Sequence, residues 1–317
     1  MRRFLVIPAV ALAALALAAP SLQAQRTPDG QPDLQGIWTN ATITPFERPA
    51  NLAGEQKLTE AEAAALEERT AKNRDNPPPP REGDVGTDTW LELGTKVVST
   101  RQTSLVIDPP DGRVPLTPEA EKIHAYQLAH NADSYEYMSL WDRCISRGTP
   151  GGMFPGGSDN AYQIIQTPGY VVIAHEMIHE AHIIPLTDKH ISQGARQLNG
   201  DSIGHWEGNT LVVDTTNFNG HGQIATSAAT GRMKSMPQTE NLHVVERFTR
   251  TDANTLDYRV TVEDPKMYSK PWTVSLPLTK DDRYRIYEYA CHEGNQATVL
   301  ELSAGRAADA AKAKAPH

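Results

Sequence analysis

The chain is poor in cysteine, and several familiar catalytic motifs are missing from it. Its 317 residues include only two cysteines, Cys144 and Cys291, which form no C-x-x-C pair. This counts against a thioredoxin-type protein. The sequence also has no G-x-S-x-G, no P-loop and no G-x-G-x-x-G. Because these glycine-rich turns carry the nucleophile or the phosphates in their families, we expect neither an α/β-hydrolase nor a nucleotide-binding fold.

Blocks of basic residues and long apolar runs are scarce as well. The formal net charge is −9 and no Lys/Arg cluster stands out, so nucleic acid is not expected as a partner. Beyond the first residues, no stretch reaches the roughly 18 apolar residues that a membrane-spanning helix needs. We therefore expect no stable membrane insertion of the mature chain.

The start of the chain has the three parts of a secretory signal. Arg2 and Arg3 precede the apolar run Phe4–Ala19, and Leu22–Ala24 is a plausible cleavage site. No cysteine stands at the cleavage point to carry a lipid. The sequence therefore predicts a signal peptide over residues 1–24 and a protein exported to the periplasm or the extracellular space.

An oxidising compartment makes a disulfide between Cys144 and Cys291 the first expectation. Two separate buried thiols remain the alternative, because a disulfide needs the two Cα atoms within about 7 Å and spacing along the chain does not report that distance. Cys291 is followed by His292 and Glu293, a cluster that could also hold a metal. We keep His292 as a candidate ligand-binding residue.

Two helices are predicted in the N-terminal half. Thr59 and Glu62 have the spacing of a capping box at the start of an Ala/Glu-rich run. A threonine followed by proline, at Thr117, starts the second helix. The Gly/Pro-rich loop over residues 148–160 either wraps a core or approaches something closely. We expect residues 25–160 to pack on a β core as helices and loops.

From Tyr162 onward, short β-rich runs alternate with turn signals. Pro168-Gly169, Glu207-Gly208-Asn209 and Asp252-Ala253-Asn254 each separate two such runs, as tight turns between antiparallel strands do. The predicted strands are Tyr162–Thr167, Tyr170–Ala174, Ile183–Leu186, Gly204–Trp206, Thr210–Thr215, Leu242–Thr249, Thr255–Val262, Trp272–Leu278 and Tyr284–Ala290.

This pattern predicts a mainly β fold. We expect an antiparallel, lipocalin-like barrel or a related sandwich over residues 161–303, with the two N-terminal helices outside it. Such barrels either hold a small ligand or bury a filled core. The last residues, 304–317, are low in complexity and are predicted to be disordered.

The most apolar segment of the mature chain, Tyr170–Leu186, contains a literal H-E-x-x-H at residues 175–179. On a helix this spacing puts His175 and His179 one turn apart on one face with Glu176 beside them, which is the zinc site and general base of a hydrolase. The Pro-Gly turn before the segment and the β-branched residues at both its ends favour strand, turn and strand instead. Zinc is then not expected, and no other cofactor is predicted.

Two further pairs are candidates for ligand binding. Arg143 and Arg147 lie just before the glycine-rich loop and could bind an anionic ligand, although exposed arginines and structural ion pairs are the commoner outcome. His205 and Glu207 flank Trp206 in a compact hairpin. They could point into a pocket, or the hairpin could be a plain turn with Trp206 packed in the core.

Several sequence blocks occur together in a fixed order: PDLQGIWTN at Pro32–Asn40, RCISRG at Arg143–Gly148, GDSIGHWEGNTLVVDTTNF at Gly200–Phe218 and EYACHEGN at Glu288–Asn295. As a set they resemble a family of exported, mostly uncharacterised bacterial proteins, and the resemblance covers nearly all of the mature chain. It implies no particular activity. Family members carry E-M-I-H, here Glu176 to His179, but they usually lack histidine at the position of His175 and commonly have arginine at that of His182. The resemblance thus favours Glu176 and His179 as acid/base candidates.

Three hypotheses for function follow. The first is an exported barrel that binds a small, partly apolar molecule and, if it also acts on it, uses Glu176 and His179 as acid and base. The second is a zinc-dependent hydrolase with His175 and His179 as ligands. The third is a non-catalytic envelope or interaction protein whose β surface is its function.

Overall fold

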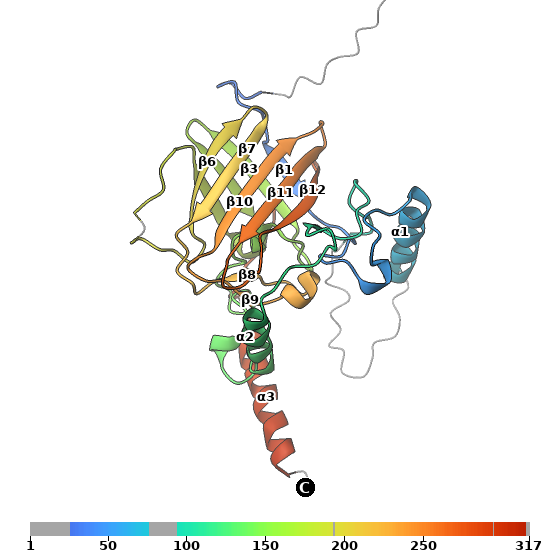
Figure 1. The fold of residues 1–317 in the computed structure, drawn as a ribbon, viewed down its shortest axis with the longest axis vertical. Helices are drawn as coiled ribbons and strands as arrows, with labels where there is room; N and C mark the ends of the chain where they lie inside the picture. Colours follow the sequence, from blue (N-terminus) through green and yellow to red (C-terminus); the bar gives the residue numbers. More distant parts are fainter. Residues whose placement is uncertain (1–25, 76–93, 193, 294, 315–317) are drawn as a thin grey trace, which may run out of the picture.

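The fold of the protein is mainly β, as predicted. The computed structural model describes residues 26–75, 94–192, 194–293 and 295–314 (Figure 1). The predicted signal peptide, residues 1–24, lies outside this part of the chain. In the described residues, nine antiparallel strands form a nearly closed barrel in the order β5-β4-β3-β1-β12-β11-β10-β7-β6, and β2 pairs with β12 off this path. Of the two predicted folds, a barrel and a sandwich, the sheet therefore forms the barrel.

The elements have the following bounds. The barrel strands are β1 Gly36–Thr39, β3 Ala161–Thr167, β4 Tyr170–His175, β5 Ala181–Pro185, β6 Asp201–Glu207, β7 Thr210–Thr216, β10 His243–Arg250, β11 Thr255–Glu263 and β12 Trp272–Lys280. The additional strands are β2 Val106–Asp108 and the small pair β8 Gln223–Ala225 and β9 Met236–Pro237. The helices are α1 Glu60–Asp75, α2 Pro118–Ala129 and α3 Ala297–Lys314.

Alternation along the strands fills the barrel interior with apolar side chains. In β11, Leu256, Tyr258, Val260 and Val262 are buried at every second position, because successive side chains of a strand point to opposite faces. Each of the three predicted tight turns joins neighbouring antiparallel strands: β3 to β4, β6 to β7 and β10 to β11. The barrel also takes in β1 and β2 from the N-terminal segment, so it is not confined to residues 161–303.

The barrel closes at a seam between its two edge strands, β5 and β6. Their backbones meet in one parallel bridge, between Leu186 and Gly204. A Cβ added at Gly204 would lie 2.8 Å from the Ile184 side chain, so glycine permits this close approach. Further along the seam, the two strands are joined by side chains, with His182 Nε2 2.7 Å from Ser202 Oγ. The seam is therefore the place where the wall of the barrel can be entered.

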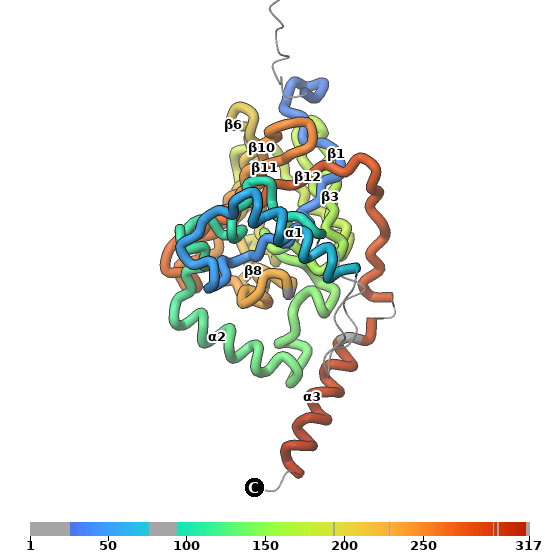
Figure 2. The backbone as a smooth tube through the Cα atoms, turned by 90° about the vertical axis from the view of Figure 1, so that its right-hand side faces the viewer, coloured from blue at the N-terminus to red at the C-terminus, as the bar shows by residue number. Residues whose placement is uncertain are grey.

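The two predicted N-terminal helices are confirmed, with their caps. The Glu62 carboxylate accepts a hydrogen bond from the Thr59 backbone N–H at 2.8 Å, and Thr59 Oγ1 accepts one from the Glu62 N–H at 3.2 Å. Thr117 Oγ1 caps α2 by accepting from the Ala120 N–H at 3.1 Å. Figures 1 and 2 show α1 beside the barrel and α2 and α3 below it. None of the described helices has the length and apolar character that a membrane crossing requires.

The C-terminal part of the chain differs from its prediction in two ways. Residues 284–290, predicted as a strand, cross the outside of the barrel without regular structure, because their neighbour β12 already pairs with β11 and β1. The tail predicted as disordered is helical up to Lys314, as part of α3. Its alanine-rich sequence has high helix propensity, and Asn131 Nδ2 anchors α3 by donating to Glu301 Oε1 at 2.8 Å.

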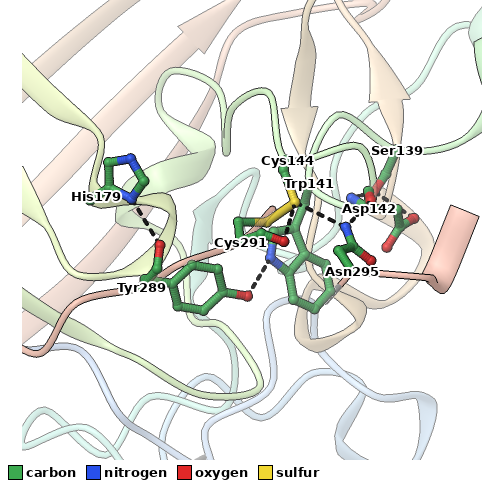
Figure 3. Close-up of a disulfide and its surroundings, with 8 residues drawn as sticks. All are labelled: Ser139, Trp141, Asp142, Cys144, His179, Tyr289, Cys291 and Asn295. Atoms are coloured by element: carbon green, nitrogen blue, oxygen red, sulfur yellow. Dashed lines mark hydrogen bonds between the residues drawn. A yellow bond between two sulfur atoms is a disulfide. The ribbon is translucent and has the colours of Figure 1, made fainter. Parts of the chain in front are cut away.

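The segment over residues 281–291, which we call the strap, is tied to the barrel covalently. The predicted disulfide between Cys144 and Cys291 is confirmed, with Cα atoms 5.6 Å apart (Figure 3). Beside it, Trp141 Nε1 donates to Tyr289 Oη at 3.4 Å. The strap therefore connects the last barrel strand to the loop that precedes residues 148–160.

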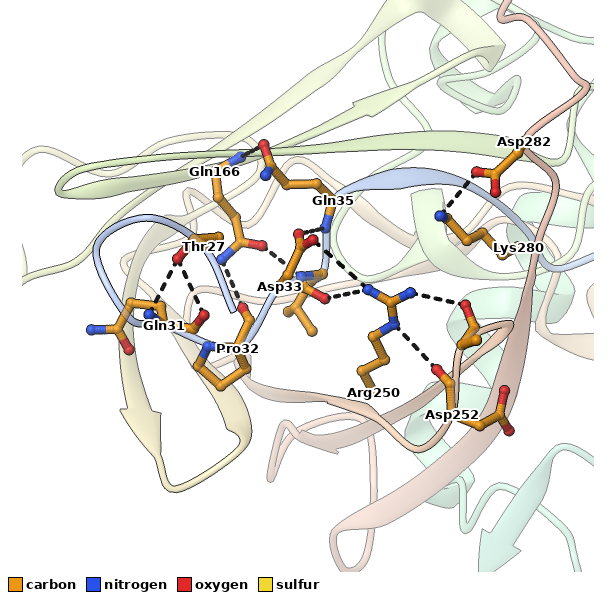
Figure 4. A network of polar contacts seen from close by, with 12 residues as sticks. Thr27, Gln31, Pro32, Asp33, Gln35, Gln166, Arg250, Asp252, Lys280 and Asp282 are labelled. Carbon is orange, nitrogen blue, oxygen red and sulfur yellow. Dashed lines mark hydrogen bonds and ion pairs between the residues drawn. The ribbon is translucent and has the colours of Figure 1, made fainter. Parts of the chain in front are cut away.

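The N-terminal segment closes one end of the barrel around Arg250 (Figure 4). The guanidinium donates to the backbone oxygens of Asp33, Asp252 and Ala253 at 2.8, 3.1 and 2.9 Å. It also lies 5.8 Å from the ring centroid of the fully buried Trp38. Because the side chain of Arg250 is only 7% exposed, this cation depends on those oxygens for its solvation.

We predict that Arg250→Ala lowers the free energy of unfolding by about 2–3 kcal/mol, since it removes three charge-assisted hydrogen bonds to backbone oxygens and the packing of the buried guanidinium on Trp38. The measurement is urea unfolding with the disulfide intact. Arg259→Ala is the control, because Arg259 is 55% exposed and pairs with Asp257 on its own strand. It should change the unfolding free energy by no more than about 0.5 kcal/mol. Equal effects of the two substitutions would contradict the role given to Arg250.

Candidate functional site

A cavity of about 310 Å³ opens at the seam of the barrel. Its wall comes from the glycine-rich loop over residues 148–153, from β5, from the start of β6 and, on the inner side, from His175 and Glu246. The registers place the cavity at the end of the barrel opposite to Arg250, because β4 ends there and β6 begins there. The cavity thus connects the outer surface with polar groups of the barrel interior.

Glu246 lies on the inward face of β10, at the inner wall of the cavity. It is 0% exposed, and its neighbours on the adjacent strands are Val213 and Val260. Tyr258 Oη donates to Glu246 Oε1 at 2.8 Å, whereas Oε2, a buried atom, has no hydrogen-bond partner. Burial raises the pKa of Glu246 to about 7, against a smaller lowering by the bond from Tyr258. The carboxyl group therefore changes its charge near neutral pH.

Two histidines share the cavity with Glu246, the buried His175 and the half-buried His182. His175 ends β4 opposite Tyr162, its ring centroid is 5.2 Å from that of Tyr162, and its buried Nδ1 has no partner. His182 Nε2 bonds Ser202 Oγ, which lies 2.8 Å from Thr215 Oγ1.

Both imidazoles are neutral at pH 7. Burial lowers the pKa of His182 to about 4. The pKa of His175 falls to about 3, mainly through burial and to a lesser extent through the charges of His182 and Arg147. A neutral imidazole keeps one N–H donor and one nitrogen acceptor, so each ring can form both kinds of hydrogen bond.

The glycine-rich loop forms the other side of the cavity, and its backbone lies close to neighbouring groups. A Cβ added at Gly152 would lie 3.0 Å from His175 Cε1, so the backbone of this residue rests on the imidazole ring. Gly148 has φ +78°, and a Cβ there would meet the Gln223 carbonyl oxygen at 2.3 Å. Both glycines are thus needed for this loop to lie where it does.

The buried Arg147 supports the loop from behind. Its Nε donates to Thr226 Oγ1 at 2.9 Å, and Nη2 lies 3.4 Å from the carbonyl oxygens of Gly151 and Phe154. Burial lowers the pKa of this guanidinium. Arg147 does not line the cavity, so its contacts are those of a residue that holds the loop in place.

Other acidic groups at the cavity are satisfied by neighbouring residues. The Glu180 carboxylate accepts from Ser146 Oγ at 2.8 Å and from the Arg147 N–H at 3.2 Å. Asp201 Oδ2 lies 2.8 Å from His190 Nδ1 and accepts from the Ile191 N–H at 2.9 Å. The free hydrogen-bonding capacity of the cavity therefore lies at its inner wall.

The H-E-x-x-H segment does not form the helix that a zinc hydrolase needs. Strand β4 ends at His175, a short 3-10 turn covers Met177–His179, and β5 begins at Ala181. His175 is buried and faces inward, while His179 is exposed at the end of the turn. Within the described residues, no group of three or more His, Cys, Asp or Glu is placed to hold a metal ion. The strand–turn–strand prediction is confirmed, and the helical zinc interpretation is wrong.

The two acid/base candidates, Glu176 and His179, hold the strap and do not line the cavity. The buried Glu176 carboxylate accepts from Tyr284 Oη at 2.8 and 2.9 Å and from the Tyr287 N–H at 2.8 Å. His179 Nδ1 lies 2.8 Å from the Tyr289 carbonyl oxygen, next to the disulfide (Figure 3). These contacts explain both residues as anchors of the strap.

The remaining candidates lie at three separate places outside the cavity, and ligand binding by them stays a prediction. Arg143 lines a separate hollow of about 290 Å³ and donates to the Tyr135 carbonyl oxygen at 3.2 Å. On the outer face of β6, Glu207 lies 3.3 Å from His205 Nε2 and accepts from Arg247 at 2.6 Å. His292 lies in an exposed turn.

Three cavity residues, Glu246, His182 and Ser202, were not among the sequence candidates. A signal for Glu246 was present, because in HVVERFTR it takes the inward position between Val244 and Phe248, where alternation calls for an apolar residue. His182 and Ser202 come together only across the seam, which no local pattern reveals.

Known proteins offer no guide to this cavity. No protein-family model, no curated protein and no solved structure matches the chain. The function has to be inferred from the residues of the cavity themselves.

We predict that Glu246→Gln becomes more stable relative to the wild type as pH rises from 5 to 8. The pKa of Glu246 is raised in the folded protein from 4.5 to about 7. Its contribution to stability is therefore fully present below pH 4.5 and is lost as pH rises through 7. The difference in unfolding free energy should shift by about 2–3 kcal/mol over this range. Urea unfolding at several pH values measures it.

The lowered pKa values of His175 and His182 make stability depend on pH in the opposite direction. Their contribution to stability is present above pH 6.5 and is lost at lower pH. They are common to both proteins and cancel in the comparison. Glu55→Gln, at an exposed position before α1, is the control and should give a difference that is flat with pH. A flat difference for Glu246→Gln would contradict the assigned burial of its charge.

Proposed function

We propose that this protein is exported and binds a small, uncharged and partly apolar molecule in the cavity at the barrel seam. The observation that carries the proposal is the inner wall, where Glu246 Oε2 and His175 Nδ1 are buried without partners. Buried polar atoms almost always have a hydrogen-bond partner. A ligand with a donor and an acceptor close together would supply the missing partners.

The size of the cavity limits what can bind. A volume of about 310 Å³ lies at the lower end of the range for small-molecule sites. Met153, Ile183 and Pro185 add apolar surface to the wall. These features favour a compact molecule with an apolar body and one polar edge.

The charges of the cavity favour a neutral ligand. Both imidazoles are uncharged at pH 7, as their low pKa values require. An anionic ligand would lose its hydration without gaining a counter-ion at the inner wall, where the carboxylate of Glu246 would also repel it, which is costly. A neutral molecule that exchanges hydrogen bonds with the wall avoids this cost.

Export is supported by two independent features. The first 24 residues have the charge and apolar pattern of a signal peptide. The disulfide between Cys144 and Cys291 is compatible with an oxidising compartment outside the cytoplasm.

We predict that neutral heteroaromatic and carbonyl fragments bind at this cavity, with 5-nitroindazole as the reference probe because it carries an N–H and a bare nitrogen side by side. Glu246→Leu should weaken its binding at least about tenfold, as expected for one lost hydrogen bond in a buried site. Isothermal titration calorimetry measures the affinity.

Glu263→Leu, on the outer face of the same barrel, is the matched control and should bind the probe like the wild type. If the wild type binds no fragment of such a panel, or if Glu246→Leu binds them equally well, the proposed function is wrong.

A further inference from the structure

Glu246 differs from Glu176, another buried carboxylate, in its hydrogen-bond partners. Glu176 receives hydrogen bonds on its carboxylate from the side chain of Tyr284 and the backbone of Tyr287. Glu246 has one oxygen held by Tyr258 and the other unpartnered. A carboxyl that served only to stabilise the barrel would gain nothing from an unpartnered oxygen, which costs about 1–3 kcal/mol when buried. The unpartnered oxygen belongs to a residue that lines the cavity.

We propose that Glu246 is a general base that takes a proton from a carbon atom of the bound ligand, so that the protein isomerises small, neutral carbonyl compounds or catalyses eliminations from them. This inference rests on the proposed function, since it assigns the chemistry of the same cavity. The base is the oxygen Oε2, and Tyr258 positions the group through Oε1.

The step balances without a metal, an oxidant or a reductant. A lone pair of Oε2 forms an O–H bond with the proton on the carbon next to the carbonyl group. The electrons of the broken C–H bond move into the adjacent C–C bond, and the carbonyl becomes an enolate. Where the ligand has a C=C bond between its β and γ carbons, the charge extends to the γ carbon, and return of the proton from Glu246 to that carbon gives the conjugated isomer and restores the carboxylate. In an elimination, the electron pair instead expels a leaving group, and the proton passes to solvent.

The neighbours of Glu246 suit this role. A carboxylate among apolar side chains such as Val213 and Val260 is a stronger base than an exposed one, and its pKa of about 7 lies near the pH where it has to work. The neutral imidazoles of His175 and His182 do not compete for the proton, because their pKa values of about 3 and 4 are lower. Their N–H groups can hydrogen-bond a carbonyl oxygen.

The test uses 5-nitrobenzisoxazole, a neutral molecule close in shape to the binding probe 5-nitroindazole. A base removes its single carbon-bound proton next to nitrogen, the N–O bond breaks, and a coloured cyanophenolate forms without any co-reactant. The wild-type protein should accelerate this opening above the rate with an equal concentration of acetate, and the rate should rise with pH through a midpoint near 7.

Two variants test whether Glu246 itself removes the proton. Glu246→Gln should lose at least about 100-fold in rate while it still binds 5-nitroindazole within about tenfold of the wild type. Glu263→Gln, exposed on β11, should leave both unchanged. Circular dichroism and thermal unfolding report whether each variant is folded, and the wild-type pH profile provides a readout that needs no variant.

Tyr258→Phe tests the positioning role. The bond from Tyr258 lowers the pKa of Glu246, so its removal should shift the midpoint of the pH profile upward. A residue that only filled space would leave the midpoint in place.

The results distinguish this inference from the proposed function. If 5-nitroindazole binds but the wild type gives no turnover above acetate, or if Glu246→Gln retains the rate, the catalytic role is overturned and the binding function stands. If neither compound interacts with the wild-type protein, both are overturned. Loss of turnover with retained binding in Glu246→Gln supports both.

Discussion

The closure of the barrel is the constraint on which the rest of the structure depends. Eight ladders of backbone hydrogen bonds join the nine barrel strands of the described residues, but β5 and β6 meet through one bridge and through the side chains of His182 and Ser202. A continuous ladder would seal the wall. The seam instead leaves room for the cavity, and the glycine-rich loop over residues 148–153 covers what the strands leave open.

Burial of polar groups inside the seam costs free energy of folding, and the surrounding fold compensates for this cost. Glu246 and His175 are buried and His182 is half-buried, and burial shifts the pKa of each group toward its neutral form. The barrel interior around them is almost entirely apolar, which provides the stability against which such groups can be kept. Titratable groups whose pKa values are strongly shifted occur at functional sites more often than elsewhere.

The sequence predicted the fold better than the site, for physical reasons. Turn residues and caps act locally, so the hairpins, α1 and α2 could be found from neighbours in the chain. The Pro-Gly turn also excluded the helical interpretation of His175 to His179. The cavity is assembled from four distant segments, and which residues face inward is known only once the register is known. Glu246 takes an inward position of β10, and the sequence of that strand does not show that this position faces a cavity.

The order of strands has a consequence for the time course of folding. Strand β1, near residue 36, lies between β3 and β12, and the partner β12 ends at Lys280. A chain made from its N-terminus therefore cannot complete the barrel until nearly all of it has been synthesised. Pairing between such distant segments is slow because the long intervening loop has to close, at a cost in entropy, before the stabilising contacts form. The protein should accordingly remain open for longer than a helical protein of its length, which suits the proposed export of the chain before it folds.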